Sequence, residues 1–183
     1  MIREKKLYLI AITLPDDLNG KILLIKQEIA RDFHSKHSLR LPAHITLQKP
    51  FHYKDESFLI KSLRTFRTSL PRFELKLNGF GAFTPKVIYV ALEENNNLKD
   101  LYRQLQKWFI SKAGFEHQEL SNKPFVPHIT VAYRDLTRQN FAAAWKRYKD
   151  KEFKAGFIVS TIDLWRHNGK HWEIIHKFSP YDM

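Results

Sequence analysis

The sequence predicts an α+β fold, in which antiparallel sheets and helices pack as layers of one domain spanning residues 1–183. A chain of this length with 43% hydrophobic residues can bury a single core. Asn168-Gly169 lies between two strand-like segments and is a specific short-range signal for a hairpin. No glycine-rich loop opens any predicted helix, which excludes the Rossmann and P-loop classes of nucleotide-binding fold.

The predicted elements begin with a strand and a helix and continue as a mixture of the two. Residues 7–14 are mostly apolar and predict a buried strand. Helical spacing of apolar residues then predicts a helix over about 18–34, with Asp16 or Asp17 as its N-terminal cap. We further predict strands over 43–49, 72–78, 87–92, a second His-Ile-Thr segment, 157–167 and 170–178, and helices over about 55–70, 98–113 and 137–149. Gly79, Gly81 and Pro85 are predicted to form the turn between two of these strands.

The composition narrows the possible functions. Thirty-one Lys and Arg residues against 19 Asp and Glu give a formal charge of +12, which attracts polyanions such as RNA or serves only solubility. The absence of cysteine excludes disulfides, thiolate metal sites and a cysteine nucleophile. No apolar segment approaches the roughly 20 residues that span a bilayer, so we expect a cytoplasmic protein without a membrane partner. No heptad pattern is present, and we expect a monomer without an obligate protein partner.

Two segments carry the strongest functional signal, because both place a His-Ile-Thr motif in a strand-like context after a proline. PAHITLQKPF contains His44 and Thr46, and FVPHITVAYR contains His128 and Thr130. Side chains alternate between the faces of a strand, so the histidine and threonine of each motif project from the same face. If the two strands face one another, a single cleft holds two imidazoles and two hydroxyls.

Such a cleft suits the hydrolysis of a phosphodiester. Imidazole has a reference pKa near 6.5, so one ring can accept a proton from water while the other donates one to the leaving oxygen. The two hydroxyls can donate hydrogen bonds to the non-bridging oxygens. No metal or other cofactor is required. The rate should then depend on pH as a bell-shaped curve whose apparent pKa values belong to the pair of rings.

Other residues are weaker candidates for binding the substrate. By alternation, Gln48 shares the face of the first motif and Arg134 that of the second, where a guanidinium could offset charge in the transition state or lie in solvent at the strand end. Tyr8, Phe51 and Phe83 could stack on a base, although most such aromatic residues belong to a core.

Two alternatives to a catalytic pair are that the motif histidines are unrelated strand residues, or that they bind a metal. The metal alternative is the weaker, because the segments contribute only two histidines and no nearby Asp or Glu on the same face.

The chain resembles the 2H phosphoesterases, which are named for two His-x-Thr/Ser motifs, and within them the bacterial 2'-5' RNA ligase and cyclic phosphodiesterase branch. The segments that carry the resemblance are LYLIAITLP, HITLQKPF, GFGAFTPKVIYVAL, PFVPHITVAYR and the final strand pair. LQKPF departs from the aromatic and glycine-containing sequence that many relatives have after the first motif, so the substrate-facing rim is expected to differ.

The resemblance implies a bilobal fold in which two pseudo-symmetric lobes of antiparallel sheet, with outer helices, surround a central cleft. It also implies metal-independent hydrolysis, or reversible ligation, of 2',3'-cyclic phosphates or 2'-5' linkages in RNA or nucleotides. His44 and His128 would be the acid–base pair, and Thr46 and Thr130 would hold the phosphate. Two alternatives stay open: an RNA- or nucleotide-binding protein without turnover that uses the same basic groove, and an enzyme for a small non-RNA phosphodiester.

Overall fold

The computed structural model of the protein describes residues 5–66, 72–112 and 124–179. Two four-stranded sheets, of order β2-β1-β7-β8 and β5-β4-β3-β6, are antiparallel throughout. The strands are β1 Lys6–Thr13, β2 His44–Tyr53, β3 Phe73–Phe83, β4 Val87–Leu92, β5 His128–Ala132, β6 Lys154–Val159, β7 Ile162–His167 and β8 Trp172–Phe178. The helices are α1 Asp16–Phe33, α2 Glu56–Phe66, α3 Asn96–Lys112 and α4 Arg138–Tyr148, and a 3-10 turn, η1, spans His37–Arg40. The α+β prediction is confirmed.

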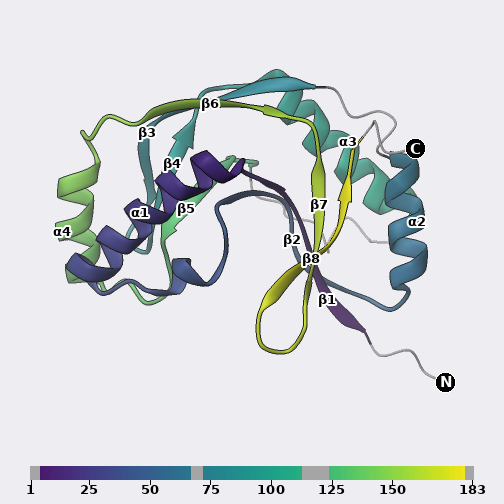
Figure 1. Ribbon diagram of the computed structural model, residues 1–183, viewed down its shortest axis with the longest axis horizontal. Coiled ribbons are helices and arrows are strands. Elements are labelled where there is room, and N and C mark those ends of the chain that lie inside the picture. The colour runs from purple at the N-terminus through teal and green to yellow at the C-terminus, as the bar shows by residue number, and fades with distance from the viewer. Residues whose placement is uncertain (1–4, 67–71, 113–123, 180–183) are drawn as a thin grey trace.

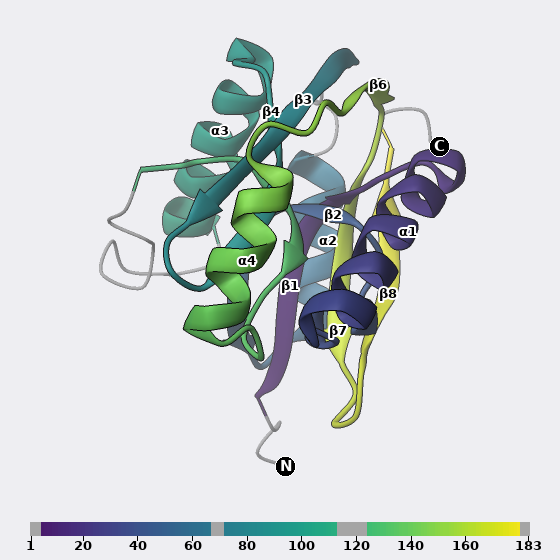
Figure 2. The same cartoon turned by 90° about the vertical axis from the view of Figure 1, so that its left-hand side faces the viewer.

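Each sheet and two helices form one lobe (Figure 1). Helices α2 and α3 pack beside the sheet that contains β1, β2, β7 and β8, whereas α1 and α4 pack on the sheet that contains β4 and β5. Figure 2 shows α1 and α4 side by side on the face toward the viewer, on the outside of the molecule. The chain passes between the lobes repeatedly, first from β1 to α1 and last from β6 to β7, so each lobe contains segments from both halves of the sequence.

The alternation of side chains explains which face of each element is buried. In β3, Phe73, Leu75 and Leu77 are buried while the residues between them are exposed. The apolar stripe predicted for the first helix is confirmed, because it supplies the buried residues Leu18, Ile22, Ile25 and Ile29 of α1. Burial of these apolar side chains provides the main favourable contribution to folding.

The turn predicted at Gly79 and Gly81 is wrong, because β3 continues through both glycines to Phe83. The hairpin turn instead occupies residues 84–86, and Phe83 pairs with Val87. Gly79 has a φ of 65° and lies where the register between β3 and β4 shifts, so it forms an irregularity inside the strand.

The single strand predicted over 157–167 is two strands in different sheets. β6 ends at Val159 in one sheet, and β7 begins at Ile162 in the other. Ser160 and Thr161 join them where the chain bends between the lobes (Figure 1). The hairpin predicted at Asn168-Gly169 is confirmed, since it connects β7 to β8 and Gly169 has a φ of 97°.

The start of α1 also differs from the prediction in its detail. The capping position is Pro15, which has no side-chain hydrogen bond, and Asp16 and Asp17 lie in the first helical turn. Their carboxylates still stabilise this end of the helix through its dipole.

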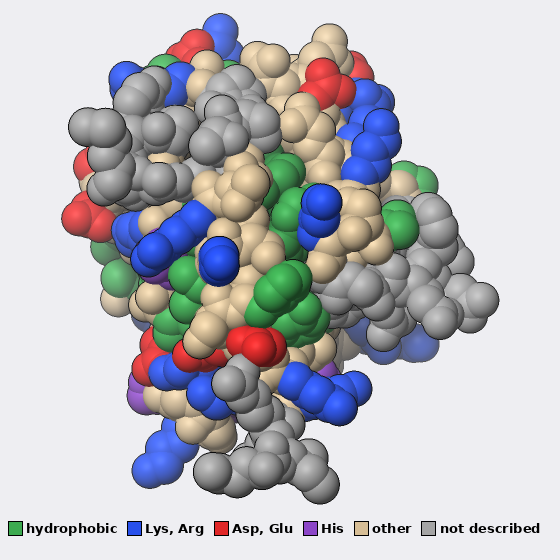
Figure 3. Space-filling view, turned by 90° about the vertical axis from the view of Figure 1, so that its right-hand side faces the viewer, with side chains coloured by type: hydrophobic (Ala, Val, Ile, Leu, Met, Phe, Trp, Pro, Cys, Tyr) green, Lys and Arg blue, Asp and Glu red, His purple; other side chains and the backbone are tan. Residues whose placement is uncertain are grey.

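The basic charge is scattered on the face drawn in Figure 3, where Lys and Arg side chains lie among acidic and apolar ones. In the described ranges, no helix combines the length and the hydropathy that crossing a membrane requires.

Candidate active site

The two His-Ile-Thr motifs meet where the two sheets approach each other. β2 and β5 are edge strands of their sheets, and their Cα atoms come within 8 Å of one another. The isoleucine of each motif, Ile45 or Ile129, is fully buried, so the histidine and threonine on either side of it project from the opposite face. The structure therefore brings His44 and Thr46 of β2 close to the second motif on β5.

The two imidazoles are held by the same kind of hydrogen bond. Nδ1 of His44 donates to the carbonyl oxygen of Pro42 at 2.8 Å, and Nδ1 of His128 donates to the carbonyl oxygen of Val126 at 2.7 Å. A carbonyl oxygen can only accept a hydrogen bond, so Nδ1 carries the proton in each ring. Nε2 of each neutral ring is then an acceptor, which is the state that a general base needs.

Burial and neighbouring charges lower the basicity of both rings. Burial, with smaller effects from Lys26 and His128, lowers the pKa of His44 to about 4. Burial and the ammonium group of Lys49 lower the pKa of His128 by less. The effect of His128 on the pKa of His44 is the repulsion between two cations, and it is the smallest of these effects on that ring.

Aromatic side chains fix the positions of both rings. Trp165 lies 5.6 Å from the ring of His44, measured between ring centroids. Phe83 contacts the ring of His128 edge-on at 4.9 Å, and Tyr89 lies 5.1 Å from it. A Cβ atom at Gly81 would come within 2.3 Å of the Tyr89 ring, so only glycine lets Tyr89 occupy this place beside His128.

A groove of about 820 Å³ lies beside the two motifs, and it is large enough for a nucleotide. Thr46, His128 and Thr130 line it together. His44 projects from the same face of β2 as Thr46 but is not itself among the lining residues. The polar groups of the groove could hold a phosphate.

Aromatic surface forms another part of the same groove. Tyr102 of α3 and Phe125 line it, and their rings stack at 3.9 Å with nearly parallel planes. Such a surface could hold a base while the threonines hold the phosphate.

Two of the weaker candidates lie in this groove. Phe83 lines it with 39% of its surface exposed. Gln48 also lines it, and its Oε1 accepts a hydrogen bond from Nε2 of Gln106 at 3.1 Å. This bond connects β2 to α3 and limits how freely the Gln48 amide can turn toward a ligand.

Tyr8 and Phe51 are placed in the core and do not line the groove. Tyr8 has no exposed surface, and its hydroxyl donates to Oε2 of Glu56 at 2.9 Å. Phe51 is 6% exposed and packs between Tyr8 and Phe109. Base stacking by either ring would require the core to open, so the structure favours the core alternative for both.

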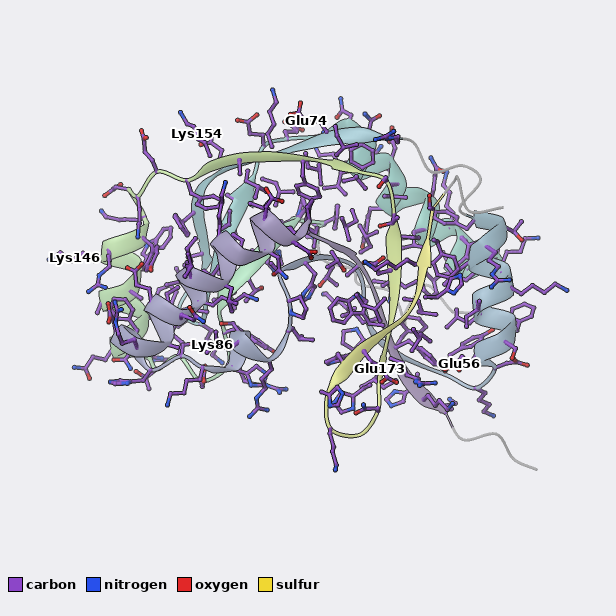
Figure 4. The ribbon with its side chains drawn as sticks, in the orientation of Figure 1. Glu56, Glu74, Lys86, Lys146, Lys154 and Glu173 are labelled. Carbon is purple, nitrogen blue, oxygen red and sulfur yellow. The ribbon has the colours of Figure 1, made fainter. Side chains whose placement is uncertain are left out.

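Replacing Tyr8 with phenylalanine is expected to reduce stability without reducing catalysis. Glu56 would keep its ion pair with Arg166, 2.9 Å away, and would lose only the phenolic donor. Figure 4 shows Glu56 and Glu173 at the lower end of one lobe, where both carboxylates bind Arg166. We expect a loss of about 1 kcal/mol in the free energy of unfolding, measured by urea denaturation. A fall in kcat at unchanged fold would contradict this assignment.

Arg134 lies outside the groove, because the alternation on which its prediction depended stops two residues earlier. β5 ends at Ala132, and Arg134 has a φ of 70°. Its Nη1 lies 3.5 Å from Nε2 of His37, and its guanidinium lies over the ring of Tyr133. Arg134 is not among the residues that line the groove.

Lys49 is a groove residue that the sequence did not identify. It follows one register shift in the pairing of β1 with β2 and lies within a second, because Ala11 pairs with Thr46, Ile10 with Gln48 and Tyr8 with Phe51. Simple alternation therefore fails after Thr46, and Lys49 lines the groove beside Gln48. No sequence pattern marked either shift.

A family model confirms where the chain belongs. The model of the 2'-5' RNA ligase superfamily matches residues 15–171. The chain belongs to this superfamily of phosphoesterases. A Geobacillus kaustophilus protein named "putative phosphoesterase" is 32% identical over 157 residues, which cover 81% of this chain and 84% of the relative. A Bacillus cytotoxicus protein of the same name is 28% identical over 167 residues, which cover 87% and 91%.

Two solved structures show the same fold at low sequence identity. TT0787 of Thermus thermophilus has a TM-score of 0.72 and 21% identity, and the match covers 94% of this chain and 97% of that one. LigT of E. coli, complexed with 3'-AMP, has a TM-score of 0.61 and 19% identity, with 98% and 100% covered. The α+β architecture of this chain is thus shared with these two structures.

Proposed function

We propose that this protein is a phosphodiesterase that hydrolyses, or in reverse ligates, 2',3'-cyclic phosphates or 2'-5' linkages in RNA or nucleotides without a metal ion. The observation that supports it most is the meeting of the two motifs at one groove, with Nδ1 of both imidazoles bonded to a carbonyl oxygen. Superfamily membership supports the phosphoester class. The complex of LigT with 3'-AMP is consistent with a nucleotide as ligand.

The proposed reaction needs one ring to accept a proton and the other to donate one. A water molecule attacks the phosphorus and loses its proton to a neutral imidazole. The bond from phosphorus to the 2' or 3' oxygen breaks, and this oxygen takes a proton from the other, protonated imidazole. The product is a nucleoside monophosphate with a phosphate on one of the two oxygens.

We propose the two roles from the different lowering of the two pKa values. His44, with a pKa of about 4, stays neutral over the wider pH range and is the proton acceptor. The pKa of His128 is lowered less, so His128 takes up a proton first as the pH falls and is the donor. Binding of an anionic phosphate between the rings raises both pKa values, because it stabilises the imidazolium forms.

The pH dependence of kcat/KM should be bell-shaped, with an optimum below pH 6.5. The acidic limb follows protonation of His44 near pH 4, and the alkaline limb follows loss of the proton from His128, whose pKa is lowered from 6.5. Both limbs report the free enzyme and can be measured with 2',3'-cyclic AMP between about pH 3.5 and pH 9. A profile that stays flat from about pH 5 to pH 9 would contradict the paired-imidazole mechanism.

A substrate panel in the presence of EDTA tests the proposed function. It compares 2',3'-cyclic nucleotides, a 2'-5'-linked dinucleotide, its 3'-5' isomer and a small phosphodiester without a base, with products identified by ³¹P NMR. We expect turnover of a cyclic or 2'-5' substrate and none of the 3'-5' isomer. Salt-sensitive RNA binding without turnover of any substrate would instead favour the non-catalytic alternative.

A further inference from the structure

The groove contains one charged side chain whose role follows from its position. Among its lining residues within the described ranges, Lys49 is the one lysine or arginine. It lies on the same strand as His44 and Thr46, five residues beyond that histidine. It is exposed to solvent.

Lys49 lines the groove together with Thr46, His128 and Thr130, so it shares this space with a histidine of the other sheet. Lys49 belongs to β2, whereas His128 belongs to β5 in the other sheet. Within the described ranges, Lys49 of β2 is the charged side chain that acts on His128, and the ring of Tyr89 packs on it from β4. A ligand that contacts His128 and the two threonines would therefore also lie near the Lys49 ammonium.

We propose that Lys49 binds the phosphate of the substrate and offsets the charge that builds up on it in the transition state, the role that strand alternation had suggested for Arg134. Binding of a phosphate by Lys49 can be measured without turnover. Only the stabilisation of the transition state depends on the proposed function. A phosphodiester carries one negative charge, which increases as water adds to phosphorus, and a nearby ammonium stabilises this increase.

The other cations nearest to the motifs have different positions. Nζ of Lys26 is buried and donates to the carbonyl oxygen of Leu41 at 2.9 Å, so it holds the segment that precedes His44. Arg134 lies beside His37 and outside the groove. Lys49 thus combines exposure, a place in the groove and proximity to His128.

The test compares Lys49→Ala and Lys49→Arg with Lys154→Ala, a matched control that removes an exposed lysine from the outer edge of β6 (Figure 4). The first measurement is the Kd of 3'-AMP at low and high salt. We expect Lys49→Ala to weaken binding about tenfold or more and to reduce its salt dependence, because one charge-assisted contact is lost. Lys49→Arg should bind nearly as the wild type, and Lys154→Ala should not differ from it.

Two further readouts separate a contact from a general loss of structure. In Lys49→Ala, the NMR titration of His128 should move to higher pH, because a repulsive cation is removed. The kcat/KM for 2',3'-cyclic AMP should fall about 10- to 100-fold and recover in Lys49→Arg.

The possible failures of the two proposals differ. Binding of 3'-AMP by Lys49→Ala within twofold of the wild type, or absence of binding by the wild type, would overturn the role of Lys49. Tight binding that depends on Lys49, without turnover of any cyclic or 2'-5' substrate, would overturn the proposed catalysis and leave the phosphate contact intact.

Discussion

Replacing either His44 or His128 with alanine is expected to lower kcat for 2',3'-cyclic AMP by about 10²- to 10⁴-fold, because each replacement removes one of the two proton transfers. In both intact rings Nδ1 donates to a carbonyl oxygen, so Nε2 is the nitrogen whose proton transfer the replacement removes. The loss should appear mainly in kcat, since the proposed phosphate contacts of the hydroxyls and Lys49 are kept in both variants.

A matched control lies on the same strand. His52 of β2 is exposed, and we expect His52→Ala to retain wild-type activity. Circular dichroism and thermal unfolding would show that the two motif variants remain folded. Wild-type turnover by either His44→Ala or His128→Ala would remove the basis of the proposed mechanism.

Replacing Thr46 or Thr130 with valine is expected to lower kcat/KM by about 10²-fold. Both hydroxyls line the groove on the faces that carry the histidines, where they could donate hydrogen bonds to the non-bridging oxygens. Removal of one preorganised donor from such a position typically costs about 10²- to 10³-fold in rate. Valine keeps the branched shape that suits a strand, so the effect isolates the hydroxyl.

Serine provides the complementary variant. Thr46→Ser and Thr130→Ser keep the donor and lose only a methyl group, and they should retain most of the activity. Steady-state kinetics on all four variants measure this difference. Equal losses in the valine and serine variants would indicate that packing, and not hydrogen bonding, is what the threonines contribute.

The sequence predicted the core of the site because short regular strands follow a simple rule. Ile45 and Ile129 are buried as alternation requires, and the histidine and threonine beside each of them project from the opposite face. Alternation correctly predicted the directions of the three His-Ile-Thr side chains in each strand. It needed no knowledge of how the two lobes pack.

The same rule failed where the strands become irregular. Arg134 lies beyond the end of β5 in a left-handed conformation, and two register shifts in β2 place Lys49 in the groove. Bulges and strand ends depend on pairing with other strands, so a single sequence does not reveal them.

The aromatic residues and the lobe crossover show the second limit. Tyr8 and Phe83 were equivalent candidates in the sequence, but Tyr8 lies on an inner strand in the core whereas Phe83 ends β3 at the groove. Likewise, residues 157–167 are suitable for one strand throughout, and only the packing of two sheets separates β6 from β7. In both cases the packing of the sheets, and not the local sequence, determined where these residues lie.

The most direct test of the paired-imidazole mechanism is an NMR titration of the two imidazoles, with and without 3'-AMP. In the proposed mechanism both rings lie beside one bound phosphate, so the pKa of His44 and that of His128 should both rise when 3'-AMP binds. In His128→Ala without ligand, the pKa of His44 should also rise, because a neighbouring cation is lost. Rings that titrate independently, with at most one responding to 3'-AMP, would contradict the claim that both act on the same phosphorus.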